Sequence, residues 1–97
     1  MPINKRWSKF NKTSVSTEKD EYGIYEIANK NETLYIGSGK IRSSLMEHFN
    51  DGNFPIVGAS MYRILYTKGQ VLQERKQREE LKKYFEQFET YPKYNRD

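Results

Sequence analysis

The chain has 97 residues, and its 17 basic and 13 acidic side chains give a net charge of +4. This length fits one domain, because chains are usually divided into domains of about 100 to 200 residues. The lack of cysteine excludes disulfides, thiol nucleophiles and cysteine-ligated zinc, and a single histidine excludes a multi-histidine metal site. A bound metal would therefore depend on carboxylates and water, which favours Mg²⁺ or Mn²⁺.

The chain contains no run of about 18 apolar residues, and its first ten residues lack the apolar segment of a signal peptide. We therefore expect no membrane partner and a cytoplasmic location. The mild basic excess is compatible with a nucleic-acid partner but does not require one.

Residues 1–20 are predicted to form a basic N-terminal arm that packs through Trp7 or Phe10. Its cations are Lys5, Arg6, Lys9 and Lys12. Residues 21–97 then form the domain proper. In it the segments "YGIYEIA" and "TLYIG" are rich in Tyr and Ile and flank the turn-like "NKNE", which predicts a β-hairpin.

Downstream of the hairpin, Ile41, Leu45 and Phe49 have the spacing of a short amphipathic helix. The segment "SMYRILYT" is predicted to be a third strand, because it combines aromatic and β-branched residues. A long helix is expected from Gln70 to about Glu89. It carries an apolar stripe, formed by Leu81, Tyr84, Phe85 and Phe88.

These elements follow the order β-β-α-β-α. They predict a small α/β fold of the α+β type, in which helices pack on a three-stranded, mostly antiparallel sheet.

Four short motifs stand in a particular order along this chain. They are "GIY" at 23–25, "YIG" at 35–37, "HF" at 48–49 and "P-x-Y-N" at 92–95. In this order the motifs resemble the GIY-YIG nuclease superfamily, and the resemblance covers about three quarters of the chain. It implies that the two motif tyrosines project from one face of the sheet.

The resemblance also implies an activity, the hydrolysis of a nucleic-acid phosphodiester with one divalent metal, Mg²⁺ or Mn²⁺. Tyr35 would help to activate water, and Tyr25 would orient that water or the phosphate. His48 would contact the scissile phosphate or accept a proton. Asn95 would close the site. The alternative for both tyrosines is that they only pack against a helix.

The catalytic arginine of the family falls on Ser44 when the helix pattern of Ile41, Leu45 and Phe49 is aligned. Arg42 is the nearest substitute, but it lies about 200° around a helix at ~100° per residue. It reaches the site only if the start of the helix is unwound or rotated.

The resemblance further implies a glutamate on the last helix that holds the metal. Glu80 is the first choice and Glu74 the second, while Glu79 is expected to point to solvent. The alternative is that all three are solvated helix residues that pair with nearby Lys and Arg.

Nucleic-acid contacts are expected from residues near the second motif and on the last helix. They are Gly37, Lys40, Arg42, Arg75 and Arg78. Three functions remain open at this point: a metal-dependent endonuclease, a nucleic-acid-binding or ribonucleoprotein subunit that has lost cleavage, and a protein-interaction module. The sequence does not distinguish DNA from RNA.

Overall fold

The structure is a computed structural model that describes residues 6–95, so Lys5 of the predicted arm lies outside the described part. The elements in chain order are β1 (Ser8–Lys9), α1 (Lys12–Ser16), β2 (Tyr22–Ala28), β3 (Thr33–Lys40), α2 (Ile41–Met46), β4 (Met61–Tyr66), α3 (Gln70–Phe88) and the 3₁₀ turn η1 (Lys93–Asn95). None of the helices in residues 6–95 is both long and apolar enough to cross a membrane.

The sheet has four strands in the order β1-β4-β2-β3, and every neighbouring pair is antiparallel. This confirms the α+β class and the three predicted strands. The predicted number of strands was wrong, because part of the N-terminal arm adds a fourth strand, β1. Only two residues of β1 pair with β4, and so short a strand has no alternation pattern that sequence reasoning can detect.

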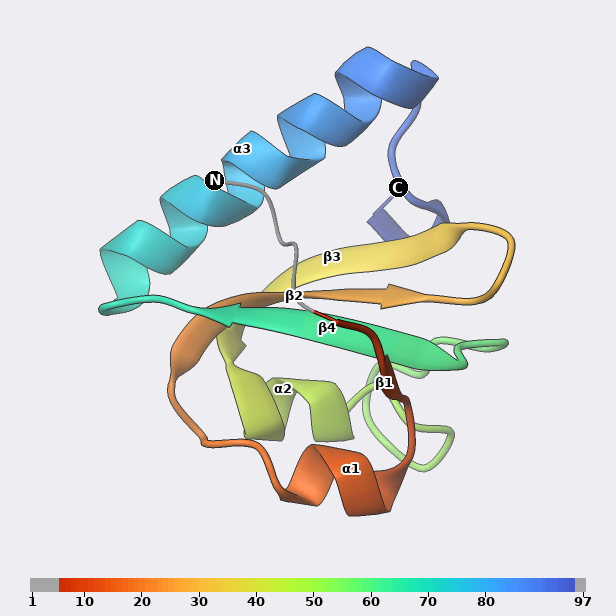
Figure 1. Ribbon diagram of the computed structural model, residues 1–97, viewed down its shortest axis with the longest axis vertical. Helices are drawn as coiled ribbons and strands as arrows, with labels where there is room; N and C mark the ends of the chain where they lie inside the picture. The colour runs from red at the N-terminus through yellow and green to blue at the C-terminus, as the bar shows by residue number, and fades with distance from the viewer. Residues whose placement is uncertain (1–5, 96–97) are drawn as a thin grey trace.

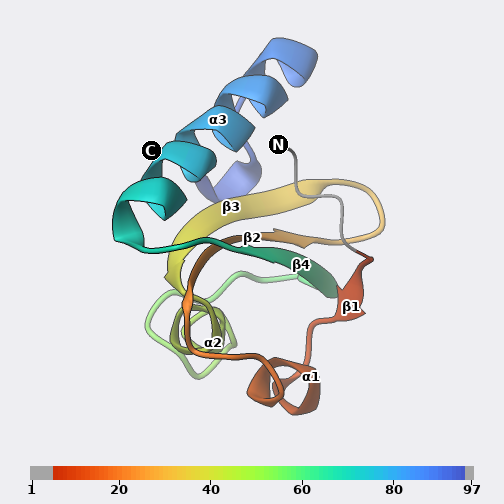
Figure 2. The same ribbon diagram turned by 60° about the vertical axis from the view of Figure 1, so that its left-hand side comes forward.

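The helices form two layers, one on each side of the sheet. Figures 1 and 2 show α3 over one face, with α1 and α2 beneath the other. The main core lies between the sheet and the α1 and α2 layer. It consists of Val15, Tyr25, Ile27, Leu34, Ile41, Leu45, Ile56, Tyr62 and Ile64.

The helix α3 ends one residue before the predicted boundary, where Glu89 adopts a left-handed conformation with φ 59°. Its predicted apolar stripe is only partly covered, since Phe85 is 43% and Phe88 53% exposed. Gln73 is the one buried residue of α3. Figure 1 shows the reason: the helix rises away from the sheet towards its C-terminal end.

Candidate functional site

The hairpin brings the two motif tyrosines together on one face of the sheet. In its register Tyr25 lies opposite Gly37, and Tyr35 lies opposite Ile27. Residues directly opposite each other in an antiparallel pair share a face. The two tyrosine rings are accordingly neighbours, with 6.0 Å between their centroids. The expectation that both tyrosines share a face is confirmed.

Gly37 is a glycine because the ring of Tyr25 lies across it. A Cβ atom added at Gly37 would stand 2.5 Å from Cζ and Oη of Tyr25 and 2.5 Å from Cε2 of Tyr35. Real Cβ atoms do not tolerate such distances. The glycine of the second motif thus has a physical basis, since the tyrosine of the first motif lies directly against it.

A histidine in the turn that follows α2 is hydrogen-bonded to the first tyrosine of this pair. Nδ1 of His48 lies 2.8 Å from the carbonyl oxygen of Phe54, which can only accept, so Nδ1 carries the hydrogen. In neutral His48 the other nitrogen, Nε2, is therefore an acceptor. The Tyr25 hydroxyl, 2.7 Å away, donates to it. The Phe54 carbonyl thereby fixes the tautomer of the ring.

Both members of this pair are held in their neutral forms. Burial raises the pKa of Tyr25 well above its ordinary value of 10.0, and the nearby Tyr35 and Glu47 raise it further. Burial also lowers the pKa of His48 below 6.5, against smaller opposing effects of the Phe54 carbonyl and Glu47. At neutral pH Tyr25 is therefore a neutral phenol. Its hydrogen bond to His48 is the path along which its proton would leave.

The tyrosine and histidine face a small cleft of about 180 Å³. Its lining consists of Tyr25, Ser38, Ser44, Glu47, His48 and Phe54. Ser44 reaches this cleft because Ile41 and Leu45, on the same helix, are fully buried against the sheet and fix the rotation of α2. Its hydroxyl sits close beside Gly39, where an added Cβ would lie 2.5 Å from Oγ.

Arg42 does not reach the cleft. Its Nη1 lies 3.4 Å from the carbonyl oxygen of Glu18, on the segment that precedes β2. The start of α2 is not unwound: it begins regularly at Ile41, and Asp20 binds both the backbone nitrogen and the hydroxyl of Ser43. The predicted catalytic role of Arg42 therefore has no geometric support.

Glu80 lies on the other face of the sheet. It lines a groove together with Glu26, which follows Tyr25 in β2 and so points to the opposite side. One of its oxygens is 3.6 Å from Nζ of Lys83. The structure therefore does not bring Glu80 to the tyrosines.

The alternative glutamates do not reach the tyrosines either. Glu74 is exposed, and Glu79 pairs with Lys76 across one helical turn. Within residues 6–95 no group of three or more His, Cys, Asp or Glu side chains is placed to hold a metal ion.

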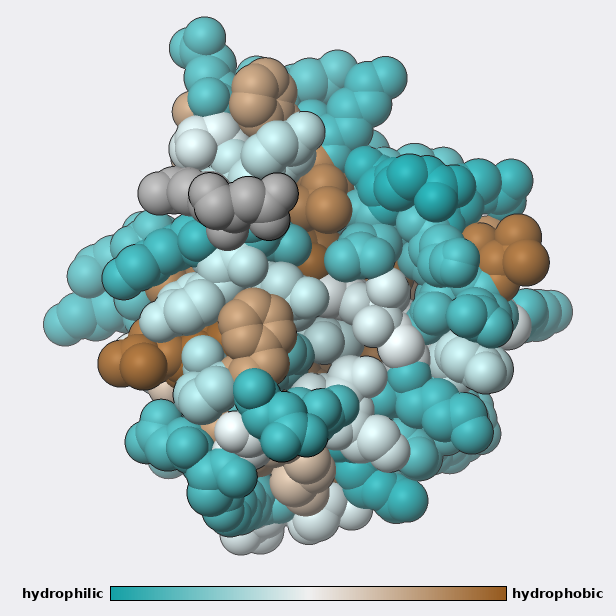
Figure 3. All heavy atoms as spheres, turned by 180° about the vertical axis from the view of Figure 1, so that it is seen from behind, coloured by the Kyte–Doolittle hydropathy of each residue, from teal (hydrophilic) through white to brown (hydrophobic). Residues whose placement is uncertain are grey.

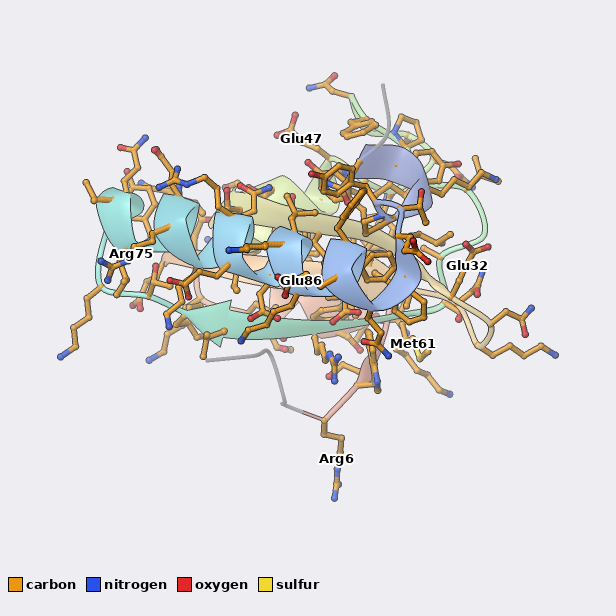
Figure 4. All side chains as sticks on the ribbon, turned by 90° about the horizontal axis from the view of Figure 1, so that it is seen from above. Arg6, Glu32, Glu47, Met61, Arg75 and Glu86 are labelled. Carbon is orange, nitrogen blue, oxygen red and sulfur yellow. The ribbon has the colours of Figure 1, made fainter. Side chains whose placement is uncertain are left out.

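The carboxylate that does line the cleft is Glu47, which the sequence analysis missed. It stands three residues after Ser44, a spacing that places two side chains on the same face of a helix. Its Oε1 accepts a hydrogen bond of 3.1 Å from the Asn53 side chain. Figure 4 shows Glu47 on the far side of the molecule from Arg6 and Met61.

Asn95 and Gln77 satisfy the open edge of β3. The Ile36 backbone nitrogen donates to Oδ1 of Asn95 at 2.9 Å, and Nδ2 of Asn95 donates back to the Ile36 carbonyl at 3.0 Å. Nε2 of Gln77 donates to the same carbonyl, and Oε1 of Gln77 accepts from the Ser38 hydroxyl. Asn95 thus pairs with the central residue of the second motif, while Gln77, on α3, reaches a residue that lines the cleft.

A family model described as a domain of unknown function, DUF7508, matches residues 1–87. The chain belongs to this family. No curated protein and no solved structure matches the chain. The match includes the two motif strands, α2 and all but the last residue of α3, whereas Asn95 lies beyond it.

In this DUF7508 domain the predicted nucleic-acid contacts are spread over three places. Gly37 is buried under the tyrosine rings, and Nζ of Lys40 lies 5.8 Å from the centre of the Tyr22 ring. Arg75 and Arg78 are exposed on α3, and Figure 4 shows Arg75 near the start of that helix. Of these cations, Arg75 and Arg78 lie one turn apart on the same helix.

Proposed function

We propose that this protein is a nucleic-acid-binding domain of the GIY-YIG nuclease type that has lost cleavage activity. The two tripeptides with their tyrosines on one face, the histidine bonded to Tyr25, and the asparagine bonded between Tyr35 and Gly37 support the relationship. The loss of cleavage is inferred from one residue, Ser44. It occupies the cleft beside Tyr25 and His48, where the family resemblance calls for an arginine.

Cleavage of a phosphodiester builds negative charge that the site must stabilise. A serine hydroxyl supplies no positive charge, and losing one electrostatic donor typically costs a factor of about 10² to 10³ in rate. The side chain of α3 that contacts the cleft residue Ser38 is Gln77, a neutral amide that is a poor substitute for a carboxylate towards a hard cation. Ser44 thus leaves the cleft without the cation expected of a cleaving site, and the α3 side chain that reaches its edge is neutral.

A second candidate, a metal-dependent endonuclease, is favoured by the fixed geometry of Tyr25 and His48. Nε2 of His48 can take the Tyr25 proton while Tyr25 takes one from an attacking water. Glu47, the carboxylate of the cleft, would hold Mg²⁺ together with substrate phosphate and water, a donor set that this ion accepts. The ion would stabilise the charge on the leaving oxygen. Glu80 plays no part in this candidate.

The two candidates are distinguished by binding and cleavage assays on branched and single-stranded DNA and RNA with Mg²⁺ or Mn²⁺. The variants are Arg42→Ala, Ser44→Arg, Tyr25→Phe and the double variant Ser44→Arg/Gln77→Glu. A domain that has lost cleavage should bind without cleaving, and the double variant should gain measurable cleavage because it adds a cation to the cleft and a carboxylate beside Ser38.

Cleavage by the wild-type protein that is lost in Tyr25→Phe but survives in Arg42→Ala would instead establish the endonuclease. If wild-type cleavage is lost in Arg42→Ala, our placement of Arg42 outside the site is wrong. If no nucleic acid binds at low salt, both candidates fail, since phosphate contacts by Lys and Arg are strongest under that condition.

A further inference from the structure

A groove between α3 and η1 lies outside the tyrosine cleft and has a volume of about 560 Å³. Its apolar lining comes from Leu81 and Phe85 of α3 and from Tyr91 of the segment that leads into η1. This volume falls within the range of about 300–1,000 Å³ typical of ligand sites. Figure 3 shows hydrophobic residues in separate patches on a largely hydrophilic surface.

The most prominent feature of this groove is a pair of open aromatic rings. The rings of Phe85 and Tyr91 have centroids 5.0 Å apart and are tilted by 41°. Each residue remains 43% exposed. Part of each side chain therefore faces the solvent, where a flat group can stack on an aromatic ring.

Two cations stand beside these rings. Arg78 and Lys82, four residues apart on α3, line the groove, and Arg75 continues the row one turn earlier. Other lysines of α3 are paired, since Lys76 lies 3.7 Å from Glu79 and Lys83 lies 3.6 Å from Glu80.

Among the ion pairs of residues 6–95, none involves Arg78 or Lys82. One carboxylate, Glu86, also lines the groove, a turn beyond Lys82. The charge beside the rings therefore has a positive excess, which is complementary to an anionic ligand.

We propose that this groove binds a single-stranded nucleic acid by stacking an unpaired base on Phe85 and Tyr91, with neighbouring phosphates at Arg78 and Lys82. Proteins bind single-stranded nucleic acids with aromatic rings flanked by cations, because every base has a π-face and every nucleotide a phosphate. An apolar protein segment in the groove would leave the two cations without a complement. This inference rests on the proposed nucleic-acid-binding function.

The groove and the tyrosine cleft flank the same edge strand. Asn95 lines the groove and is also bonded to Ile36, the central residue of the second motif. A nucleic-acid strand that enters the groove therefore lies beside β3. Two further residues of β3, Gly37 and Ser38, border the tyrosine cleft. The groove is a means of holding single-stranded nucleic acid near that cleft.

The test measures fluorescence anisotropy of labelled oligothymidine, of oligouridine, of a DNA duplex and of an abasic oligonucleotide of equal length and charge. Phe85→Leu/Tyr91→Leu removes the stacking surface but keeps apolar volume, and circular dichroism confirms that the variant is folded. Phe88→Leu is the matched control, because Phe88 is an exposed aromatic of α3 that lines other grooves. Arg78→Gln/Lys82→Gln is matched by Lys76→Gln/Lys83→Gln.

We expect Phe85→Leu/Tyr91→Leu to weaken oligothymidine or oligouridine binding by about 5- to 150-fold and to leave binding of the abasic strand unchanged. Phe88→Leu should bind as the wild type does. Arg78→Gln/Lys82→Gln should weaken both the normal and the abasic strand and reduce the salt dependence, more than its control does.

Two results would overturn the inference while leaving the proposed function standing. One is wild-type binding to single strands that Phe85→Leu/Tyr91→Leu does not weaken more than Phe88→Leu does. The other is equal affinity of the wild type for normal and abasic strands. A wild type that binds no nucleic acid would overturn the proposed function as well.

Discussion

The two faces of the sheet differ in what they bury. On the face covered by α1 and α2, Val15 and Leu45 are fully buried and the polar Tyr25 and His48 satisfy each other. On the face covered by α3, the ion pair between Glu26 and Arg63 occupies the centre, beside a groove of about 380 Å³. One face supplies most of the apolar core, and the other keeps charged groups and open grooves.

The difference originates in the alternation of the central strand β2. Its residues Tyr25 and Ile27 point to the α2 side, whereas Glu26 between them points to the α3 side. Glu26 is 8% exposed and is satisfied by Arg63 and by the Thr33 hydroxyl. The Arg63 guanidinium in turn lies 4.3 Å from the centre of the Trp7 ring. The helix α3 covers these charged groups and buries only Gln73 among its own residues.

The sharpest test of this comparison is a pair of truncations, one on each side. Leu45→Ala should reduce the free energy of unfolding by about 2–5 kcal/mol, because Leu45 is fully buried in the core. Phe88→Ala should reduce it by less than about 1 kcal/mol, since Phe88 is 53% exposed. Urea unfolding measures both. Similar losses for the two variants would show that α3 is part of the same core.

The ion pair beneath α3 gives the next largest effect. Arg63→Met should reduce the free energy of unfolding by about 2 kcal/mol, because it leaves the buried Glu26 carboxylate without its cation. Arg63 is itself partly exposed, which keeps the loss below that of a fully buried pair. The double variant Glu26→Gln/Arg63→Met should recover part of the loss.

The surface pair of Lys76 and Glu79 is the control for this ion pair, and Lys76→Gln should change the free energy of unfolding by less than about 0.5 kcal/mol. If Glu26→Gln/Arg63→Met shows no recovery in urea unfolding, Glu26 and Arg63 do not act together.

The fold was largely predictable because its signals are local. The two-residue alternation of β2, the apolar spacing of α2 and the long uninterrupted run of α3 each report one element. The fourth strand was missed because β1 pairs over only Ser8 and Lys9, and its formation depends on β4, far along the chain. The exposure of Phe85 was missed for a similar reason, since it depends on how α3 tilts over the sheet.

The candidate site was predictable only where its residues lie on the two motif strands, on α2 or in the turn directly after it. Tyr25, Tyr35 and His48 come together because strand register and helix rotation follow from local pattern. Which residues of α3 reach the site does not follow from such a pattern, because it depends on how the helix lies over the sheet. Glu80 was therefore misplaced, and Gln77, which reaches Ser38, was overlooked.

Acid should weaken the α2 side in a defined pH range. Burial lowers the pKa of His48 below its ordinary 6.5, so the unfolded chain binds a proton more readily than the folded one. Stability should therefore fall as the pH is lowered below about 6.5, by at most ~1.4 kcal/mol per pH unit, until the lowered pKa is passed.

The variant His48→Gln should flatten this dependence, because an amide can accept from Tyr25 and donate to the Phe54 carbonyl without titrating. Urea unfolding at pH 7.5, 6.5 and 5.5 compares the two proteins. An equal slope in both would assign the pH dependence to groups other than His48.

The smallest expected effect concerns the start of α2, which sets the contents of the tyrosine cleft. The N-cap residue of α2, Lys40, makes no side-chain hydrogen bond to the helix backbone. Asp20 caps the helix instead, because its carboxylate accepts from the backbone nitrogen and the hydroxyl of Ser43. Asp20→Ala should thus cost about 1 kcal/mol of unfolding free energy, as the loss of a helix cap does. Ser43→Ala, which keeps the backbone bond, should cost less.

The Ser43 hydrogen bonds also lower the pKa of Asp20 below 3.8, so the effect of Asp20→Ala should persist at pH 5 and disappear only as the pH falls below about 3.8. Amide hydrogen exchange provides a local measurement, in which Ser43 should lose protection in Asp20→Ala while Leu45 keeps it. If Ser43 stays protected, the start of α2 is held by its own packing. Loss of protection would mean that the bond to Asp20 keeps α2 wound from Ile41, and hence keeps Ser44 rather than Arg42 in the cleft.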